Sequence, residues 1–500
     1  MSILARYALL AACLVNLAAV EQASAQNAGP LPAYNVDPSQ VSVSGVSSGA
    51  SMAIQLGVAY ASRIMGVAAF STAPYDCLRG LGSSLTSNNC TGFNTPQIAE
   101  LKGNMLRWSG KENDPVQDIA SQRIYVFVGK HDVTDSATVV NQTVNLYREF
   151  VPDANLQYET AIDAGHTLPT DFEIPGWPGY TCEKPGEIPL ANCRYDGAGV
   201  SLQWIYGPLT RAVVAAGSLF PIDQSEFVTR AQGMDTIGWL YVPKSCEAGA
   251  VCRLHVFLHP CGQSYFTRND TLYANYSGHS LWADANNIVL LFPQTYPDTT
   301  VNPDGCWDDS GIYDDGFDRK AGKQTSAIMA MVDRITSGFR AAVKAIEYRH
   351  ADWDHYFVTS SPDEIAKLDA GVFGGWARTG ETFDVYPVGT PGTSNVCRFF
   401  STSFAPKSSH FYTASAEECD SVKRNPDWQF EDVVFAVAVP DSIGGCRALT
   451  SPVHRLYNNG QGGAPNHRYT TSLSTRAAMV ASGWTSEGAG DEGVVACSAP

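Results

Sequence analysis

The segment from Val41 to Tyr60 constrains the fold of this chain more than any other. Its sequence, VSVSGVSSGASMAIQLGVAY, begins with the apolar alternation of a strand and continues after Gly49 with the small and apolar spacing of a helix. A G-x-S-x-G motif centred on Ser47 joins the two, which is typical of a nucleophile elbow. Such a turn holds its serine in strained backbone between two residues without a Cβ. We therefore expect Ser47 to be a nucleophile and the N–H of Ser48 to bind an oxyanion.

The motif by itself is weak evidence of catalysis. Because glycine occupies 44 of the 500 positions, about one chain in every few of this length contains such a pentapeptide by chance. A catalytic serine also requires a general base and an acid that orients it. Residues 123–128 are typical of a strand, and the turn that follows contains Asp132 as the candidate acid, with Asp135 as its competitor. A solvated turn aspartate is the simpler alternative.

The candidate base is His166. It follows a predicted strand at 156–160 and lies in a loop beside Gly165, where an α/β-hydrolase carries its histidine. Residues 136–150, between the two strands, have helical spacing. The order Ser47, Asp132, His166 is therefore that of the α/β-hydrolase triad.

The strands that usually precede the nucleophile are missing ahead of Val41. Three later segments have the pattern of strands, at 236–242, 254–258 and 288–292. We predict a circularly permuted α/β-hydrolase whose first strands come from residues 230–345. The loop after the second of these segments would supply the other oxyanion donor; Pro260 has no N–H, so Cys261 would donate. A disulfide-bonded turn is the alternative for this loop, and both can hold together.

The chain resembles the extracellular poly(3-hydroxybutyrate) depolymerases whose lipase box precedes the oxyanion segment. The matching stretches are VSGVSSGASMAIQLGVAYAS, APYDC, VGKHDVT, DAGHTLPTDF, YDGAG, FLHPCGQSY, LLFPQ and NPDGCWDDSG, within residues 35–345. The resemblance implies Ser47 as nucleophile, Asp132 as orienting acid and His166 as base. It also implies an oxyanion hole formed by Ser48 and Cys261, and Trp307 in the substrate cleft.

Two positions depart from the family pattern. The usual H-G-C loop is H-P-C here, which should stiffen it without harm. The segment after G-C-W is acidic (Asp308, Asp309) where the family has aromatic residues. The second departure bears on substrate preference, because a cleft for an apolar polyester should be lined with aromatic side chains.

The first 25 residues have the features of a secretory signal. Arg6 precedes an apolar run that ends near Val20, and Ala23-Ser24-Ala25 forms a cleavage site, so we expect a secreted protein, extracellular or periplasmic. The alternative is a lipoprotein box that leaves Cys13 lipidated. No later segment is long and apolar enough for a membrane span.

Cysteine usage agrees with export. Of the 13 cysteines, those after Cys13 form two sets of even number, which indicates disulfides within two regions. Close spacing favours Cys182–Cys193, Cys246–Cys252 and Cys77–Cys90, which leaves Cys261–Cys306 by elimination. The absence of C-x-x-C argues against zinc or redox chemistry.

The last third contains a loose threefold repeat. The segments HYFVT, HFYT and HRYT begin at His355, His410 and His467, and a tryptophan follows each one. Units of this size cannot fold alone, so we predict residues 346–500 to form one small, mainly β domain with trefoil-like packing after a hydrolase domain at 26–345. Its aromatic residues are expected to form a core rather than a sugar- or polymer-stacking face. Its ligand cannot be derived, and a binding role follows only from its position.

Together these features predict a secreted serine esterase that cleaves a short-chain polyhydroxyalkanoate through a Ser-His-Asp triad and an acyl-enzyme. We expect no cofactor and no metal. The net charge of −17 argues against nucleic acid as a partner. Two alternatives remain: a carboxylesterase acting on feruloyl or acetyl esters of plant walls, and a non-catalytic adhesin with a vestigial elbow.

Overall fold

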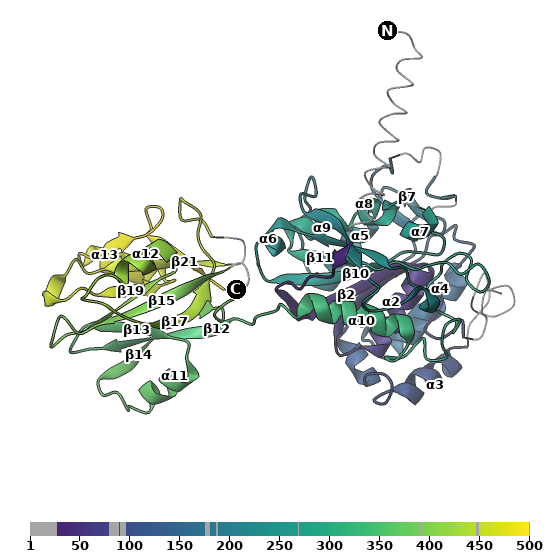
Figure 1. Ribbon diagram of the computed structural model, residues 1–500. Helices are drawn as coiled ribbons and strands as arrows, with labels where there is room; N and C mark the ends of the chain where they lie inside the picture. The colour runs from purple at the N-terminus through teal and green to yellow at the C-terminus, as the bar shows by residue number, and fades with distance from the viewer. Residues whose placement is uncertain are drawn as a thin grey trace, which may run out of the picture. The chain divides into compact units, whose positions relative to one another are not determined.

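The computed structural model describes residues 28–79, 90, 97–175, 181–186, 189–268, 270–390, 393–446 and 450–499. The chain divides into two compact units, Met1–Phe339 and Arg340–Pro500 (Figure 1). The predicted signal at 1–25, with Cys13, lies outside the described residues. Among the helices in the described ranges, none combines the length and apolar character needed to cross a bilayer.

The first unit is built on a nine-stranded sheet in the order β1-β8-β9-β11-β10-β2-β3-β4-β5. The strands are β1 (Gly29–Pro30), β2 (Val36–Val46), β3 (Ile64–Phe70), β4 (Arg123–Phe127), β5 (Leu156–Glu159), β8 (Ser218–Asp223), β9 (Ile237–Val242), β10 (Cys252–Leu258) and β11 (Ile288–Phe292). The six strands from β11 to β5 run parallel, and β9 is antiparallel to both of its neighbours. A separate pair consists of β6 (Leu168–Thr170) and β7 (Leu190–Asn192).

The predicted circular permutation is confirmed by the strand order. The elbow strand β2 pairs with β3 on one side and with β10, from more than two hundred positions later, on the other. Gly45 has Ala69 of β3 and Leu258 of β10 as its partners in register. The loop after β10 therefore leaves the sheet beside the nucleophile, at the edge where all the parallel strands end.

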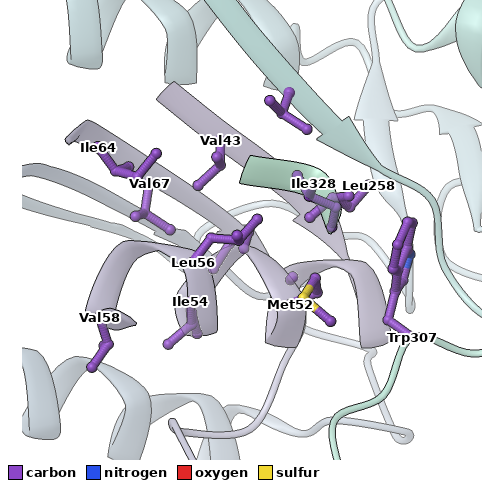
Figure 2. Packing of buried hydrophobic residues seen from close by; sticks show 14 of the residues in the cluster. Val43, Met52, Ile54, Leu56, Val58, Ile64, Val67, Leu258, Trp307 and Ile328 are labelled. Carbon is purple, nitrogen blue, oxygen red and sulfur yellow. The ribbon is translucent and has the colours of Figure 1, made fainter. Parts of the chain in front are cut away.

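Helices cover both faces of this sheet. One face carries α2 (Ser48–Ala59), α3 (Ile98–Trp108), α4 (Ala137–Arg148) and α10 (Lys323–Thr336). The other carries α5 (Gly197–Tyr206), α8 (Leu272–Tyr276) and α9 (His279–Ala285), and α6 (Lys244–Glu247) and α7 (Tyr265–Arg268) are short helices in loops. Figure 2 shows Met52 and Leu56 of α2 packed toward Val43 and Val67 of the sheet, with Ile328 of α10 beside them. This buried contact is what fixes the direction of α2 after the elbow.

All four disulfides predicted for the first unit form: Cys77–Cys90, Cys182–Cys193, Cys246–Cys252 and Cys261–Cys306. Cys397–Cys419 and Cys446–Cys497 form in the second unit. Each of the six bonds therefore joins residues of the same unit, as the even division of the cysteines indicated.

The second unit consists of three repeats, each with an antiparallel sheet of its own (Figure 1). In each repeat a helix lies between the second and third strands, so the repeats are not the all-strand units of a strict β-trefoil. The first repeat has β12 (Val343–His350), β13 (His355–Thr359), α11 (Pro362–Asp369) and β14 (Trp376–Val385); the second has β15 (Ser394–Ser401), β16 (Ser409–Thr413), α12 (Ala416–Val422) and β17 (Gln429–Val437); the third has β18 (Ser451–Tyr457), β19 (His467–Thr470), α13 (Leu473–Ala481), β20 (Thr485–Glu487) and β21 (Val494–Ser498).

Two tyrosines join the repeats at the centre of this unit. The hydroxyl of Tyr412 donates to Val358 O (2.7 Å) and accepts from Val358 N (3.0 Å). Tyr469 makes the same pair of bonds to the N and O of Tyr412, at 2.9 and 2.8 Å. Because both tyrosines are buried, each hydroxyl satisfies backbone groups that water cannot reach.

These central bonds correct the alignment of the repeats. Val358, Tyr412 and Tyr469 are equivalent, and each immediately precedes a threonine that accepts the N–H of the helix-capping serine. The equivalent of His410 and His467 is therefore Tyr356, not His355 as the sequence match indicated. The match failed because the first copy, HYFVT, is one residue longer than the other two.

We expect Tyr412→Phe to destabilise the repeat unit by about 1–3 kcal/mol, because Val358 N–H and C=O lose their shared partner in a buried site. Urea unfolding of the full chain, monitored for the transition of this unit, measures the change. Tyr457→Phe, at a half-buried position of the third repeat, is the control and should change stability little. Equal midpoints for the two variants would show that the central hydroxyl contributes nothing.

Candidate active site

Ser47 lies in the strained turn that its motif predicted. Its backbone has φ 55° and ψ −124°, a left-handed conformation that side chains rarely adopt. A Cβ on Gly45 would lie 2.3 Å from the carbonyl oxygen of Gly49, and a Cβ on Gly49 would lie 2.2 Å from Leu258 O. Both glycines are therefore required by space. The N–H of Ser47 donates to Phe70 O at 2.9 Å, which ties the strained residue to the end of β3.

His166 is hydrogen-bonded to Asp132, as predicted. Its Nδ1 lies 2.9 Å from Asp132 Oδ2, and the other carboxylate oxygen accepts the N–H groups of Thr134 and Asp135 at 2.9 and 3.0 Å. The aspartate side chain is completely buried, and the histidine side chain is 16% exposed. Asp132 is thus fixed on both oxygens and can hold the imidazole in one orientation. In the structure Asp132, and not Asp135, is hydrogen-bonded to His166.

The two loops that carry this pair are held together by backbone contacts. His131 N donates to Ala164 O at 2.8 Å, and Lys130 N donates to Ile162 O at 3.0 Å. A Cβ on Gly129 would lie only 2.1 Å from Ala164 O. The close approach of the loops after β4 and β5 therefore brings acid and base together although they are far apart in sequence.

A cavity of about 220 Å³ opens at the carboxyl edge of the sheet, beside the nucleophile. Ser47, Ser48, Asp135 and Cys261 are among the residues that line it. His166, in the loop after β5, interacts electrostatically with Asp135, which is one of these lining residues. The structure thus brings together the predicted nucleophile, base, acid and oxyanion residues at one edge.

The charges around His166 favour its protonated form. Burial lowers its pKa, but the hydrogen bond that His166 donates to Asp132 and the negative charges of Asp132 and Asp135 outweigh burial, and the pKa of His166 is raised. A base supported in this way can accept a proton from a serine and hold it as the imidazolium.

The loop after β10 passes directly over the elbow. Cys261 Sγ lies 3.2 Å from Ser48 Oγ, and its disulfide to Cys306 and the bond from Gly262 N to Asp304 O (2.6 Å) hold the loop in place. His259, at the start of this loop, is fully buried, and burial lowers its pKa to about 4. It is therefore a neutral structural residue that accepts from Thr295 N at 3.2 Å.

The expectation that Trp307 lines the substrate cleft is wrong in this structure. Its side chain is 0% exposed and belongs to the core beneath the elbow (Figure 2). Its indole N–H donates to His259 O at 2.9 Å. Trp307 therefore supports the loop of Cys261 from the protein side and has no surface left for a ligand.

The two acidic residues after Trp307 have different roles. The carboxylate of Asp308 accepts N–H groups from Gly311, Ile312 and Tyr313 at 2.8–3.1 Å and so stabilises its own loop. Asp309 lines the cavity. Burial and the charges of Asp308 and Asp135 raise the pKa of Asp309 to about 8. Burial likewise raises the pKa of Asp135 to about 7, against the attraction of His166.

With a pKa of about 8, Asp309 is mainly a neutral carboxylic acid at pH 7 and can donate a hydrogen bond where a carboxylate could only accept. The sequence marked this segment as a departure but did not indicate the protonation of Asp309, which depends on burial and on the charges of Asp308 and Asp135. Among the described residues, no group of three or more His, Cys, Asp or Glu side chains is arranged to hold a metal ion.

Comparisons with known proteins separate the two units. Residues 347–493 match a family described as a domain of unknown function (DUF5648). A polyhydroxybutyrate depolymerase of Talaromyces funiculosus is 41% identical over 343 residues, which are 66% of this chain and 98% of that protein. A poly(3-hydroxybutyrate) depolymerase of Delftia acidovorans is 36% identical over 315 residues, 62% of each protein.

Solved structures agree with these relatives. The PHB depolymerase of Penicillium funiculosum matches with a TM-score of 0.58 at 40% identity, covering 62% of this chain and 99% of that one. A PHB depolymerase variant complexed with an R3HB trimer matches with the same values.

Asp132→Asn should lower kcat by about 10⁴-fold, because an amide stabilises the wrong tautomer of His166 and cannot stabilise the imidazolium. Asp135→Asn is the matched control, since it removes a carboxyl group of the same cavity that does not bond to the histidine; it should cost less than about tenfold. Steady-state hydrolysis of a soluble ester measures both. A larger loss in Asp135→Asn would reverse the assignment of the acid.

The kcat/KM should fall as the pH rises through about 8, where Asp309 ionises and places a negative charge in the cavity in which the oxyanion develops. Asp309→Asn should remove this alkaline loss. The raised folded-state pKa also means that the carboxyl group costs stability increasingly as the pH rises from about 4 to 8, so the variant should gain stability over the same window.

Asp153→Asn, at a side chain that is 89% exposed, provides the control for this pH profile and should leave it unchanged. An identical alkaline limb in Asp309→Asn would show that another group controls it.

Proposed function

The chain belongs to the polyhydroxybutyrate depolymerase family, and from this premise we propose that it is an exported serine esterase that hydrolyses a short-chain polyhydroxyalkanoate such as poly(3-hydroxybutyrate). The observation that carries the proposal is the Asp132–His166 pair at the same sheet edge as the strained Ser47. The relatives' names and the R3HB trimer bound to a related structure support the substrate. The six disulfides are consistent with export.

The reaction begins with proton transfer from Ser47 to His166 and attack of Ser47 Oγ on a backbone ester carbonyl. Asp132 keeps Nδ1 of the imidazole protonated, so that Nε2 is the atom that accepts the proton. His166 then gives this proton to the leaving alkoxide. Water, activated by the same histidine, releases a hydroxyacid or short oligomer from the acyl-enzyme.

The oxyanion of each tetrahedral intermediate is placed between the N–H groups of Ser48 and Cys261. Ser48 opens α2, so its N–H also lies at the positive end of a helix. Each such donor is typically worth about 3 kcal/mol of barrier. The disulfide of Cys261 and the buried Trp307 keep the second donor at a fixed height above the elbow.

Because acidic side chains line the cavity, this site differs from an entirely apolar cleft. The protonated side chain of Asp309 can donate to an ester carbonyl next to the one under attack, and every repeating unit of a polyhydroxyalkanoate presents such a carbonyl. An acidic segment is therefore compatible with a polyester as long as Asp309, the carboxyl group of this segment that lines the cavity, stays neutral.

Ser47→Ala should lower kcat by at least about 10⁴-fold and abolish covalent labelling by a fluorophosphonate probe. Ser48→Ala is the matched control: it keeps the backbone N–H that binds the oxyanion, and it should still be labelled. Clearing of a poly(3-hydroxybutyrate) suspension and release of ferulate from bran are measured in parallel with the unmodified chain. Ferulate release without clearing would contradict the polyester assignment, and labelling that persists in Ser47→Ala would contradict the nucleophile.

A further inference from the structure

The repeat unit contains a cleft of about 580 Å³ between its first and second repeats. Its walls include Trp353, Phe373 and Trp376 of the first repeat, and its floor includes Glu364 and Arg398. It is larger than the cavity beside Ser47 and lies wholly within residues 353–431. An aromatic cleft of this volume with a few convergent polar groups is the usual form of a small-ligand site.

The floor of the cleft is a network of charged side chains. Arg398 donates to both oxygens of Glu364, at 2.8 and 2.9 Å, and its Nε donates to Glu431 at 2.8 Å. His410 Nε2 lies 3.3 Å from Glu431. The arginine side chain is 9% exposed, whereas the two glutamates are 30% and 29% exposed. The carboxylates are thus oriented by the arginine and still reach the solvent of the cleft.

The same network recurs between the second and third repeats. Arg455 bonds to both oxygens of Glu418 at 2.8 and 3.0 Å and lies 3.1 Å from Glu487, which His467 approaches at 3.5 Å. Because the network occurs at two junctions, its main structural role is to join neighbouring repeats. The network alone therefore does not mark a ligand site.

Only part of the apolar wall of the first cleft recurs: Trp376 has a counterpart in Trp428, but the exposed loop before it differs. Trp353 is 36% exposed, Val372 is 65% exposed and Phe373 is 49% exposed. In the second repeat, the residues at the same distance before the tryptophan that follows the helix are Arg424 and Asn425, in place of Val372 and Phe373. Exposed apolar side chains added to only one of two equivalent clefts need a reason other than the packing of repeats.

We propose that this cleft binds a neutral carbohydrate, whose ring packs on Trp353 and Phe373 while its hydroxyl groups donate to Glu364 and Glu431. The apolar face of a sugar ring matches an aromatic wall. Its hydroxyl groups can donate to the carboxylate lone pairs that the bonds from Arg398 leave open. The carboxylates remain ionised, because the side-chain hydrogen bonds of Arg398 lower the pKa of Glu364 despite burial, and His410 lowers that of Glu431.

Two other ligand classes fit the same groups less well. A polyester has only acceptor oxygens, so it would cover Glu364 and Glu431 without giving either carboxylate a donor, which costs free energy. A cation would approach Arg398 as closely as the carboxylates, and the guanidinium would repel it. A hydroxyl-rich ligand without charge satisfies the carboxylates and avoids this repulsion.

Isothermal titration calorimetry of the full chain with cellohexaose, xylohexaose and chitohexaose tests the proposal. We expect at least one of them to bind, and Trp353→Ala and Phe373→Ala each to weaken this binding by about tenfold or more. Arg424→Ala, at the equivalent loop of the second repeat, should bind like the unmodified chain. Hydrolysis of a soluble ester should be unchanged in all three variants, which separates this result from the function of Ser47.

Three outcomes would overturn the proposal. The first is that none of the three oligosaccharides binds. The second is that binding persists unchanged in the folded double variant Trp353→Ala/Phe373→Ala, whose folding is checked by circular dichroism. The third is that the variants lose adsorption to a poly(3-hydroxybutyrate) film while no saccharide binds, which would identify the cleft as a polymer-docking surface.

Discussion

The catalytic centre depends on one steric contact, between Gly49 at the start of α2 and the carbonyl groups at the end of β10. No side chain fits between them, since a Cβ on Gly49 would lie 2.2 Å from Leu258 O and 2.6 Å from His259 O. This approach brings the start of α2, with Ser48, against the loop that contains Cys261. The contact requires only that the strand beside β2 be in register with it, whatever its place in the sequence. β10 can therefore come from far along the chain.

Around this contact, buried polar groups are held by bonds that come from other loops. Asp132 is oriented by backbone N–H groups, His259 by Thr295, and the His259 carbonyl by Trp307. Such groups cannot relax toward water, so the donors and the base are already arranged when the substrate arrives. The protonated Asp309 belongs to the same scheme, because its neutrality comes from burial and from the acidic groups around it.

The sequence was sufficient for the parts of the site that depend on chain order. Ser47, Asp132 and His166 each follow a recognisable strand, and the carboxyl ends of parallel strands meet at one edge. The sequence was insufficient where the role of a side chain depends on which residues pack around it. Trp307 is an aromatic residue of the kind expected in a substrate cleft. In the structure its N–H donates to His259 O and its ring packs in the core, and the local sequence predicts neither contact.

In the repeats, too, the sequence pattern and the packing of side chains give different results. An alignment on histidine predicted three equivalent copies, but the central bonds of Tyr412 and Tyr469 place Glu347 at the position of Arg398 and Arg455, so the first repeat has the opposite charge there. Glu347 meets the opposite charge from Arg468, at 2.8 Å. Every junction between repeats therefore contains an ion pair with a largely buried arginine, built in two different ways. Because each of the three junctions has its own ion pair, the exposed Phe373 of the first repeat, where the other two repeats have Asn425 and Ala481, is not needed to join the repeats, and binding of a ligand is the simplest reason to keep it exposed.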